Sequence, residues 1–146
     1  IIKRAAALFD TVYAAVLHNP DKSGFFSPQE REEMLKDSCS CFENVQVIIW
    51  PGLASALAEQ LKVKVIVRGV RTVADFENEM QMAELNRRLC AGPETFLIPC
   101  SSSLSAVSSS AVRQIAAFGG DLKPFVPEQA IDKIRNRFSP NAIVFK

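Results

Sequence analysis

The sequence predicts an α/β fold in which helices alternate with the strands of a doubly wound parallel sheet. Short apolar runs recur along the chain, and segments of helical composition separate them. The runs are almost continuously apolar, as expected for parallel strands that are buried on both faces. With 146 residues, 48% of them hydrophobic, the chain is large enough for one domain with a sizeable core.

The first half of the chain supplies the first part of this alternation. The expected elements are a helix end at 1–9, a strand at 11–17, a helix from 28 to about 37, a strand at 45–49, a helix at 53–61 and a strand at 63–67. The second helix has the strongest start signal, because Ser27 can cap it, Pro28 suits its first position and Glu30 completes a capping box.

The second half is expected to contain more helix. The expected elements are a helix from Thr72 or Asp75 to about Cys90, a strand at 94–99, a helix from Ser108 or Ser109 to Phe118, a helix from Pro127 to about Arg137 and an apolar tail at 142–145. Gly119 or Gly120 can take the left-handed conformation that ends a helix.

Composition narrows the classes of function. The net charge of +1 gives no broad basic field for nucleic acid or an anionic membrane. The longest apolar runs are much shorter than a bilayer span, and the N-terminus lacks the pattern of a signal peptide. Cys39, Cys41, Cys90 and Cys100 have neither CxxC spacing nor a histidine cluster, so reduced thiols in the cytoplasm and no metal site are expected. The only histidine, His18, is expected in a loop after a strand; a lone histidine is more often incidental than catalytic, although loops at strand ends favour a functional role.

Cations at strand ends indicate a phosphate site. Arg68 and Arg71 fall where the strand at 63–67 is expected to end, and ligands of open α/β sheets bind at the carboxyl ends of strands. Arginine can grip phosphate oxygens with two donors. Lys22 follows the strand at 11–17 in the same way. The serines at 108–110 open a helix, where free N–H groups can hold phosphate. The alternative is that the serines only cap this helix and the cations are solvated.

Three blocks of sequence, taken together and in order, resemble the phosphopantetheine adenylyltransferase family. They are residues 19–31 with NPDK and FSPQER, residues 68–87 beginning RGVRTVADFENE, and residues 108–127 beginning SSSAVR. This resemblance implies a Rossmann-like, five-stranded parallel sheet with helices on both faces, formed by a nucleotidyltransferase domain at 1–138. It also implies transfer of the adenylyl group of ATP to 4′-phosphopantetheine, which yields the coenzyme A precursor dephospho-coenzyme A and pyrophosphate. Mg²⁺ as cofactor and a homohexamer are further implications.

The resemblance assigns roles by position. Lys22 would contact the reacting phosphates, Arg68 the phosphate of phosphopantetheine, and Ala54 its pantetheine arm. Arg71 would bind the ATP phosphates, and Lys22 and Arg71 are the catalytic candidates. Further ATP contacts are implied for Gly69, Val70, Glu79, Leu104, Ser105, Ala106, Val107, Ser108, Ser109 and Ser110.

One part of the family pattern lies upstream of Ile1. It is the first strand and a Thr/His-x-Gly-His motif, whose last histidine stabilises the transition state. Two explanations are open: the sequence is incomplete at its start, or the tail at 139–146 replaces the central strand, as in a circular permutation. A central strand cannot be omitted without leaving backbone groups of both neighbouring strands unpaired.

Three other interpretations compete with this one. Cytidylyltransferases and nicotinate-nucleotide adenylyltransferases share the fold but usually lack the 68–87 block. A catalytically impaired paralogue or fragment would bind ATP or coenzyme A without turnover. In the third interpretation, Arg68 and Arg71 make only structural salt bridges.

Overall fold

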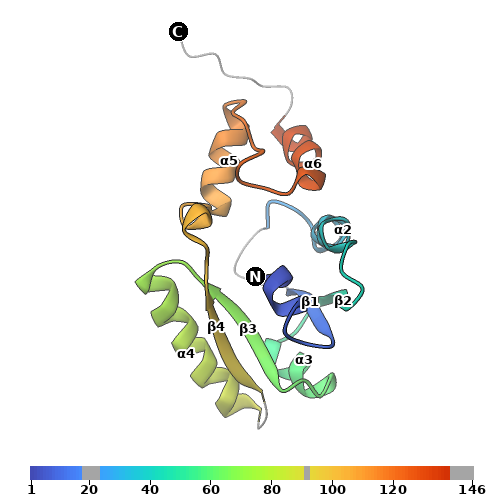
Figure 1. Cartoon of the computed structure of the whole chain (residues 1–146), viewed down its shortest axis with the longest axis vertical. Coiled ribbons are helices and arrows are strands. Elements are labelled where there is room, and N and C mark those ends of the chain that lie inside the picture. The colour runs from blue at the N-terminus through green and yellow to red at the C-terminus, as the bar shows by residue number, and fades with distance from the viewer. Residues whose placement is uncertain (18–23, 91–92, 139–146) are drawn as a thin grey trace. The chain divides into compact units, whose positions relative to one another are not determined.

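The computed structural model describes residues 1–17, 24–90 and 93–138. They belong to two compact units, Ile1–Ser101 and the segment from Ser102 onward. The first unit contains, in chain order, α1 (Ile2–Ala6), β1 (Val12–Leu17), α2 (Pro28–Cys39), β2 (Val45–Trp50), α3 (Ala54–Gln60), β3 (Val65–Val70), α4 (Val73–Leu89) and β4 (Glu94–Pro99); the second contains the 3-10 helix η1 (Ser102–Leu104), α5 (Ser109–Ala117) and α6 (Glu128–Phe138) (Figure 1).

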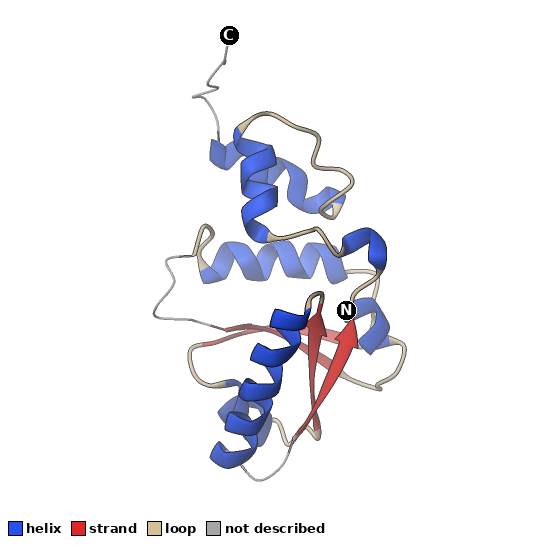
Figure 2. Cartoon of the chain, turned by 90° about the vertical axis from the view of Figure 1, so that its left-hand side faces the viewer, coloured by secondary structure: helices blue, strands red, loops and turns tan. Residues whose placement is uncertain are grey.

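The four described strands form two separate parallel pairs (Figure 2). In the first pair, β1 lies beside β2 with Val12 opposite Val45. In the second, β3 lies beside β4 with Val65 opposite Glu94. The parallel α/β class is therefore confirmed. One continuous five-stranded sheet is not confirmed, because the described residues supply four strands in two sheets.

Helices cover both strand pairs of the first unit. α2 packs on β1 and β2, and α4 packs on β3 and β4. Side chains near the N-terminus join the two pairs. The Arg4 guanidinium donates to the Pro99 carbonyl at 2.6 Å, and the rings of Phe9 and Phe96 lie 6.5 Å apart between centroids. The two sheets are thus held in one unit, although no hydrogen-bonded ladder joins them among the described residues.

Most of the expected helix boundaries are confirmed by their capping contacts. Ser27 and Glu30 form the reciprocal capping box of α2. The Thr72 hydroxyl accepts a hydrogen bond from the Asp75 N–H at the start of α4, and Ser108 caps α5 in the same way. Gly119 has a φ of 70°, the left-handed conformation expected after α5.

One strand starts and ends later than expected. The sequence predicted a strand at 63–67, whereas β3 spans Val65–Val70. The turn after α3 is longer because Lys62 takes a left-handed φ of 54° and the Val63 N–H bonds to the Ala58 carbonyl at 3.0 Å. Lysine at such a position is uncommon, so apolar pattern alone placed the strand too early.

The second unit has its own small core. α5 and α6 pack together, and Leu122 between them is completely buried. Four further side chains are buried with it, namely Ala116, Ala130, Ile131 and Ile134. Those of α6 share one face at helical spacing, which explains why this segment is a helix.

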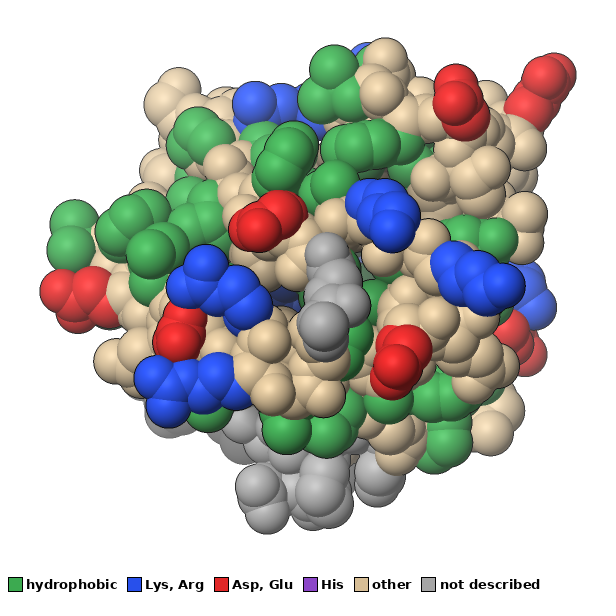
Figure 3. All heavy atoms as spheres, turned by 90° about the horizontal axis from the view of Figure 1, so that it is seen from below, with side chains coloured by type: hydrophobic (Ala, Val, Ile, Leu, Met, Phe, Trp, Pro, Cys, Tyr) green, Lys and Arg blue, Asp and Glu red, His purple; other side chains and the backbone are tan. Residues whose placement is uncertain are grey.

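The surface carries mixed charge. On the face shown in Figure 3, positive and negative side chains alternate with exposed hydrophobic ones and do not gather by sign. None of the described helices is both long and apolar enough to cross a membrane.

Candidate active-site residues

The corner between β3 and α4 carries the two predicted phosphate ligands. The sequence placed Arg68 just after a strand, and this detail is wrong: Arg68 lies inside β3, opposite Leu97 of β4. The strand continues to Val70 because its start is displaced by the turn at Lys62. Of the two arginines, Arg71 alone follows the carboxyl end of the strand.

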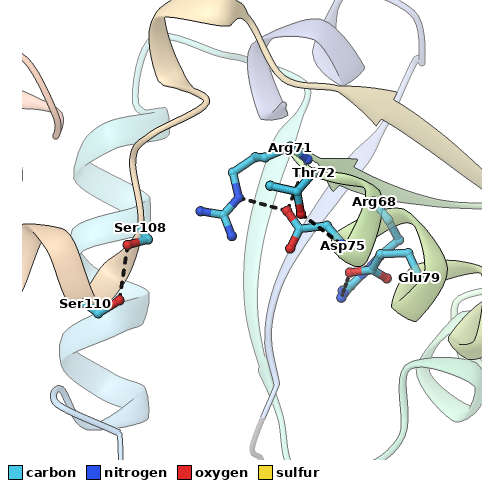
Figure 4. A network of polar contacts seen from close by, with 7 residues as sticks. All are labelled: Arg68, Arg71, Thr72, Asp75, Glu79, Ser108 and Ser110. Atoms are coloured by element: carbon cyan, nitrogen blue, oxygen red, sulfur yellow. Dashed lines mark hydrogen bonds and ion pairs between the residues drawn. The ribbon is translucent and has the colours of Figure 1, made fainter.

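Arg68 forms a two-pronged ion pair with Glu79 of α4. Its Nε and Nη2 donate to the two carboxylate oxygens of Glu79, each at 2.7 Å (Figure 4). The Glu79 side chain is only 17% exposed, whereas that of Arg68 is 45% exposed. The hydrogen bond to Glu79 raises the pKa of Arg68, although partial burial acts in the opposite direction. Such a bidentate contact between a guanidinium and a carboxylate fixes the plane of the Arg68 guanidinium.

Arg71 is paired with Asp75 one helical turn further on. Its side-chain Nε and its backbone N–H both donate to the same Asp75 oxygen, at 3.0 and 3.1 Å. The Asp75 N–H in turn donates to the Thr72 hydroxyl at 3.1 Å. The hydrogen bond from the Arg71 side chain lowers the pKa of Asp75. Asp75 therefore fixes Arg71 against the first turn of α4.

These contacts bear on the alternative that the two arginines are structural. Each arginine does form a salt bridge, to Glu79 and to Asp75 respectively. A guanidinium has five N–H donors, and Glu79 uses two of those of Arg68. Since further donors of Arg68 are left for an anion, the salt bridge and a phosphate contact are compatible. The ligand role itself stays a prediction.

Ala54 and Arg68 lie at one cavity. Ala54 is the first residue of α3, and both residues line a hollow of about 360 Å³ in the first unit. The structure thereby brings together the two described residues that were predicted to contact phosphopantetheine. Gly69 and Val70, predicted along ATP, continue β3 toward Arg71.

The serine-rich segment belongs to the second unit. The hydroxyl of Ser108 accepts from the Ala111 N–H at 3.1 Å and lies 3.2 Å from that of Ser110 (Figure 4). Ser109 and Ser110 form the exposed first turn of α5. Before it, Leu104 ends η1, Ser105 and Ala106 are exposed, and the Val107 N–H bonds to the Leu104 carbonyl at 3.1 Å. The capping interpretation of Ser108 is confirmed, and a ligand role for the other serines stays a prediction.

Several predicted features lie outside the described residues. They are Lys22, His18 and the tail at 139–146. Within the described ranges, no group of three His, Cys, Asp or Glu side chains is arranged to hold a metal ion.

The sequence interpretation missed Asp75 as a functional candidate. The available signal was its spacing, because an acid four residues after an arginine at a helix start can reach back to it. Glu79 was found only as a predicted ATP contact. Its pairing with Arg68 could not be foreseen while Arg68 was expected beyond the strand.

Known proteins resemble this chain over most of its length. The cytidylyltransferase-like family matches residues 1–115. A phosphopantetheine adenylyltransferase from Clostridium perfringens is 40% identical over 139 residues, which cover 95% of this chain and 85% of that protein. Proteins of the same name from Synechococcus sp. and Gloeobacter violaceus are both 42% identical, over 94% and 95% of this chain and over 87% and 86% of their own lengths.

These matches extend over 94–95% of the chain at 40–42% identity. We conclude that the chain belongs to the phosphopantetheine adenylyltransferase family, within the cytidylyltransferase-like nucleotidyltransferases.

Proposed function

We propose that this chain transfers the adenylyl group of ATP to 4′-phosphopantetheine, a step of coenzyme A biosynthesis. The observation that carries the proposal is the 40–42% identity to proteins named phosphopantetheine adenylyltransferase over about 95% of the chain. The products are dephospho-coenzyme A and pyrophosphate. The β3–α4 corner agrees with this function, since it presents two arginines in fixed orientations.

Arg68 is proposed to bind the phosphate of 4′-phosphopantetheine. Glu79 holds its guanidinium plane, and the side chain lines the same cavity as Ala54. A dianionic phosphate offers more negative charge than one carboxylate and can take the donors that Glu79 does not use. Ala54 then contacts the pantetheine arm.

Arg71 is proposed to bind ATP phosphates. It follows the carboxyl end of β3, the position at which open α/β sheets bind ligands. Gly69, Val70 and Glu79 complete the nucleotide contacts on this side. Lys22, which lies outside the described residues, is proposed as the further cation at the reacting phosphates.

The segment from Leu104 to Ser110 is proposed to contribute to ATP binding through the start of α5. A helix N-terminus carries unpaired N–H groups and the positive end of the helix dipole. One N–H of this turn is already taken by the Ser108 hydroxyl. The hydroxyls of Ser109 and Ser110 are exposed there and can add hydrogen bonds to phosphate oxygens.

The chemistry is a direct displacement. An oxygen of the acceptor phosphate attacks the α-phosphorus of ATP, the bond from that phosphorus to the bridging oxygen of the β-phosphate breaks, and pyrophosphate leaves. No covalent enzyme intermediate is needed. The protein then acts by orienting two anions and stabilising charge on the transferring group, and Arg68 and Arg71 are suited to these tasks.

The described residues contain no group of three or more His, Cys, Asp or Glu side chains that could bind Mg²⁺. Asp75 and Glu79, the acids of the corner, already accept hydrogen bonds from arginines. Mg²⁺ in nucleotide sites is often held largely by phosphates and water, so it would arrive with ATP.

The homohexamer, the cytoplasmic location and the five-stranded sheet with helices on both faces complete the proposal. One observation supports assembly: α4 exposes several large apolar side chains, namely Phe76, Met80, Met82, Leu85 and Leu89. By helical spacing, Phe76 and Met80 share one face of α4, and Met82, Leu85 and Leu89 share another. Large apolar side chains exposed together on a helix face are typical of protein–protein contacts. Light scattering of the purified chain would give six chain masses, whereas a single chain mass would contradict the hexamer.

The test of the function is pyrophosphate release by the full chain from ATP and 4′-phosphopantetheine. We expect release that requires both substrates and falls strongly in Arg71→Gln. Arg88→Gln is the matched control, because Arg88 is an exposed arginine of α4 that pairs with Glu84 outside the site. Binding of ATP without any pyrophosphate release would contradict the proposal and favour an impaired paralogue. Preference for CTP, or for nicotinate mononucleotide as acceptor, would favour the other nucleotidyltransferases.

A further inference from the structure

Trp50 lies at the carboxyl end of β2. It is the last residue of that strand and the only tryptophan of the chain. In the parallel ladder it lies opposite Leu17, the last residue of β1. Ligands of open α/β sheets bind at the carboxyl ends of the strands. A large, half-buried aromatic side chain therefore stands at the ligand-binding edge of the first strand pair.

The indole of Trp50 holds the turn that leads into α3. Its Nε1 donates a hydrogen bond to the Leu53 carbonyl at 3.0 Å. The same carbonyl accepts the first hydrogen bond of α3, from the Leu57 N–H at 3.2 Å. A carbonyl oxygen has two lone pairs and can accept both bonds. The indole thus contacts the backbone at the point where the helix begins.

The sequence of α3 itself fixes the start of this helix only weakly. The helix has seven residues, and short helices gain little stability from their own propensity. Leu53 occupies the N-cap position, where serine, threonine, asparagine or aspartate would supply a side-chain acceptor. The first turn contains no acidic residue, and the Leu53 side chain is 60% exposed. The Trp50 indole therefore supplies an anchor that the residues of α3 do not.

Gly52 shows how closely the turn fits the indole. A Cβ added to Gly52 would lie 2.9 Å from Nε1 and 3.3 Å from Cε2 of Trp50. Both distances are shorter than the separation of about 3.5–4.0 Å that non-bonded atoms prefer. A side chain at residue 52 would therefore displace the indole from the Leu53 carbonyl. Substitution of Gly52 is thus a second way to disturb this contact, without any change to Trp50 itself.

We propose that Trp50 is a positioning residue for 4′-phosphopantetheine, and that it acts through the Leu53 carbonyl on the start of α3. Ala54 directly follows Leu53 and is the residue proposed to contact the pantetheine arm, so this inference rests on the proposed function. A helix start that is fixed before the ligand arrives removes an ordering cost from binding. The proposed ATP contacts lie on β3, α4 and the segment 104–110, so ATP binding does not depend on this turn.

The proposal is tested by calorimetric binding of each substrate to the full chain. Trp50→Phe keeps an aromatic ring but removes the N–H donor, and Gly52→Ala keeps the donor but displaces the ring. Each variant should bind 4′-phosphopantetheine roughly two- to tenfold more weakly, as expected for the loss of one neutral hydrogen bond, and ATP within about twofold of the wild type. Ser40→Ala is the matched control, because its hydroxyl donates to the Asp37 carbonyl, three residues away, at 2.9 Å. It should bind both substrates as the wild type does.

Tryptophan fluorescence gives a readout that a purely structural role would not change. Because the chain contains one tryptophan, all of this emission comes from the turn before α3. Addition of 4′-phosphopantetheine to the wild type should change the emission saturably, with a midpoint equal to the calorimetric Kd. Addition of ATP alone should change it much less.

Three outcomes would overturn the proposal. In the first, Trp50→Phe and Gly52→Ala bind 4′-phosphopantetheine as tightly as the wild type. In the second, both variants lose affinity for the two substrates equally, which indicates a general loss of structure. In the third, the emission does not respond to saturating 4′-phosphopantetheine. All three leave the proposed function intact, because the wild type still binds both substrates and releases pyrophosphate. A wild-type chain that binds ATP but not 4′-phosphopantetheine would instead overturn the proposed function, and this inference with it.

Discussion

The β3–α4 corner and the start of α5 are both predicted phosphate sites, but they are built differently. At the corner, two arginines are held by carboxylates of the following helix. At the start of α5, neutral hydroxyls cap N–H groups and contact each other. Full charges in fixed geometry give stronger and more directional contacts than hydroxyls and a helix dipole. The comparison teaches that losses of function should concentrate at the corner and losses of stability at the cap.

The largest effect is expected for Arg68. Hydrogen bonds to charged groups contribute about 1.5–3 kcal/mol, so Arg68→Ala should lower kcat/KM for 4′-phosphopantetheine by about 100-fold. Arg68→Lys keeps the positive charge but loses the planar guanidinium with its two parallel donors. Its kcat/KM should therefore lie between those of the wild type and Arg68→Ala. The measurement is steady-state kinetics, with Arg88→Ala expected within about twofold of the wild type. If Arg68→Ala and Arg88→Ala lowered kcat/KM by the same small factor, the β3–α4 corner would not be part of the substrate-binding site.

At the start of α5, we expect substitution of the capping residue Ser108 to affect stability more than substitution of Ser110. Removing the Ser108 hydroxyl leaves the Ala111 N–H without its acceptor, and loss of such a cap costs about 1 kcal/mol. We expect Ser108→Ala to lower the free energy of unfolding in urea by that amount. Ser110→Ala is the matched control, because its hydroxyl contacts only Ser108 among the interactions described for it. A larger loss in Ser110→Ala than in Ser108→Ala would contradict this assignment.

A substitution of Asp75 tests whether this carboxylate positions Arg71 for ATP binding. It accepts two hydrogen bonds from Arg71, and without it the arginine side chain regains rotamer freedom. Asp75→Asn should raise KM for ATP by roughly three- to fivefold while kcat changes less. Tighter ATP binding in this variant would show that Asp75 competes with the phosphates and does not position Arg71.

The smallest effect is the pH dependence of the Arg71–Asp75 pair. The pKa of Asp75 is lowered in the folded chain, so its contribution to stability is present above the unfolded-state pKa of about 3.9. It is lost as the pH falls through the lower folded-state pKa. The melting temperatures of wild type and Asp75→Asn should therefore differ above about pH 5 and converge in stronger acid. A difference that stays constant with pH would contradict the ion pair, whereas Ser110→Ala should show such constancy.

The parts of the fold that local chemistry determines were predictable from sequence. Ser27 with Glu30 defines the start of α2, Ser108 that of α5, and Gly119 the end of α5. Such caps involve residues within four positions of each other, so the sequence displays them directly. The identity of the family likewise follows from ordered blocks of residues.

Features that depend on tertiary structure were less accessible. The left-handed Lys62 delayed β3 and moved Arg68 into the strand, which no apolar pattern indicates. The Arg68–Glu79 pair joins a strand to the second turn of a helix, so it depends on how α4 packs on β3. The division of the four described strands into two pairs likewise depends on tertiary structure and could not be predicted from the apolar runs.

The most direct test of the β3–α4 corner is calorimetric binding of 4′-phosphopantetheine to the full chain. If Arg68 holds the acceptor phosphate, Arg68→Gln should weaken binding by at least about tenfold. Ser110→Ala should bind the acceptor as the wild type does, and both variants should melt cooperatively. Wild-type affinity in a folded Arg68→Gln variant would contradict the assignment of the corner to substrate binding.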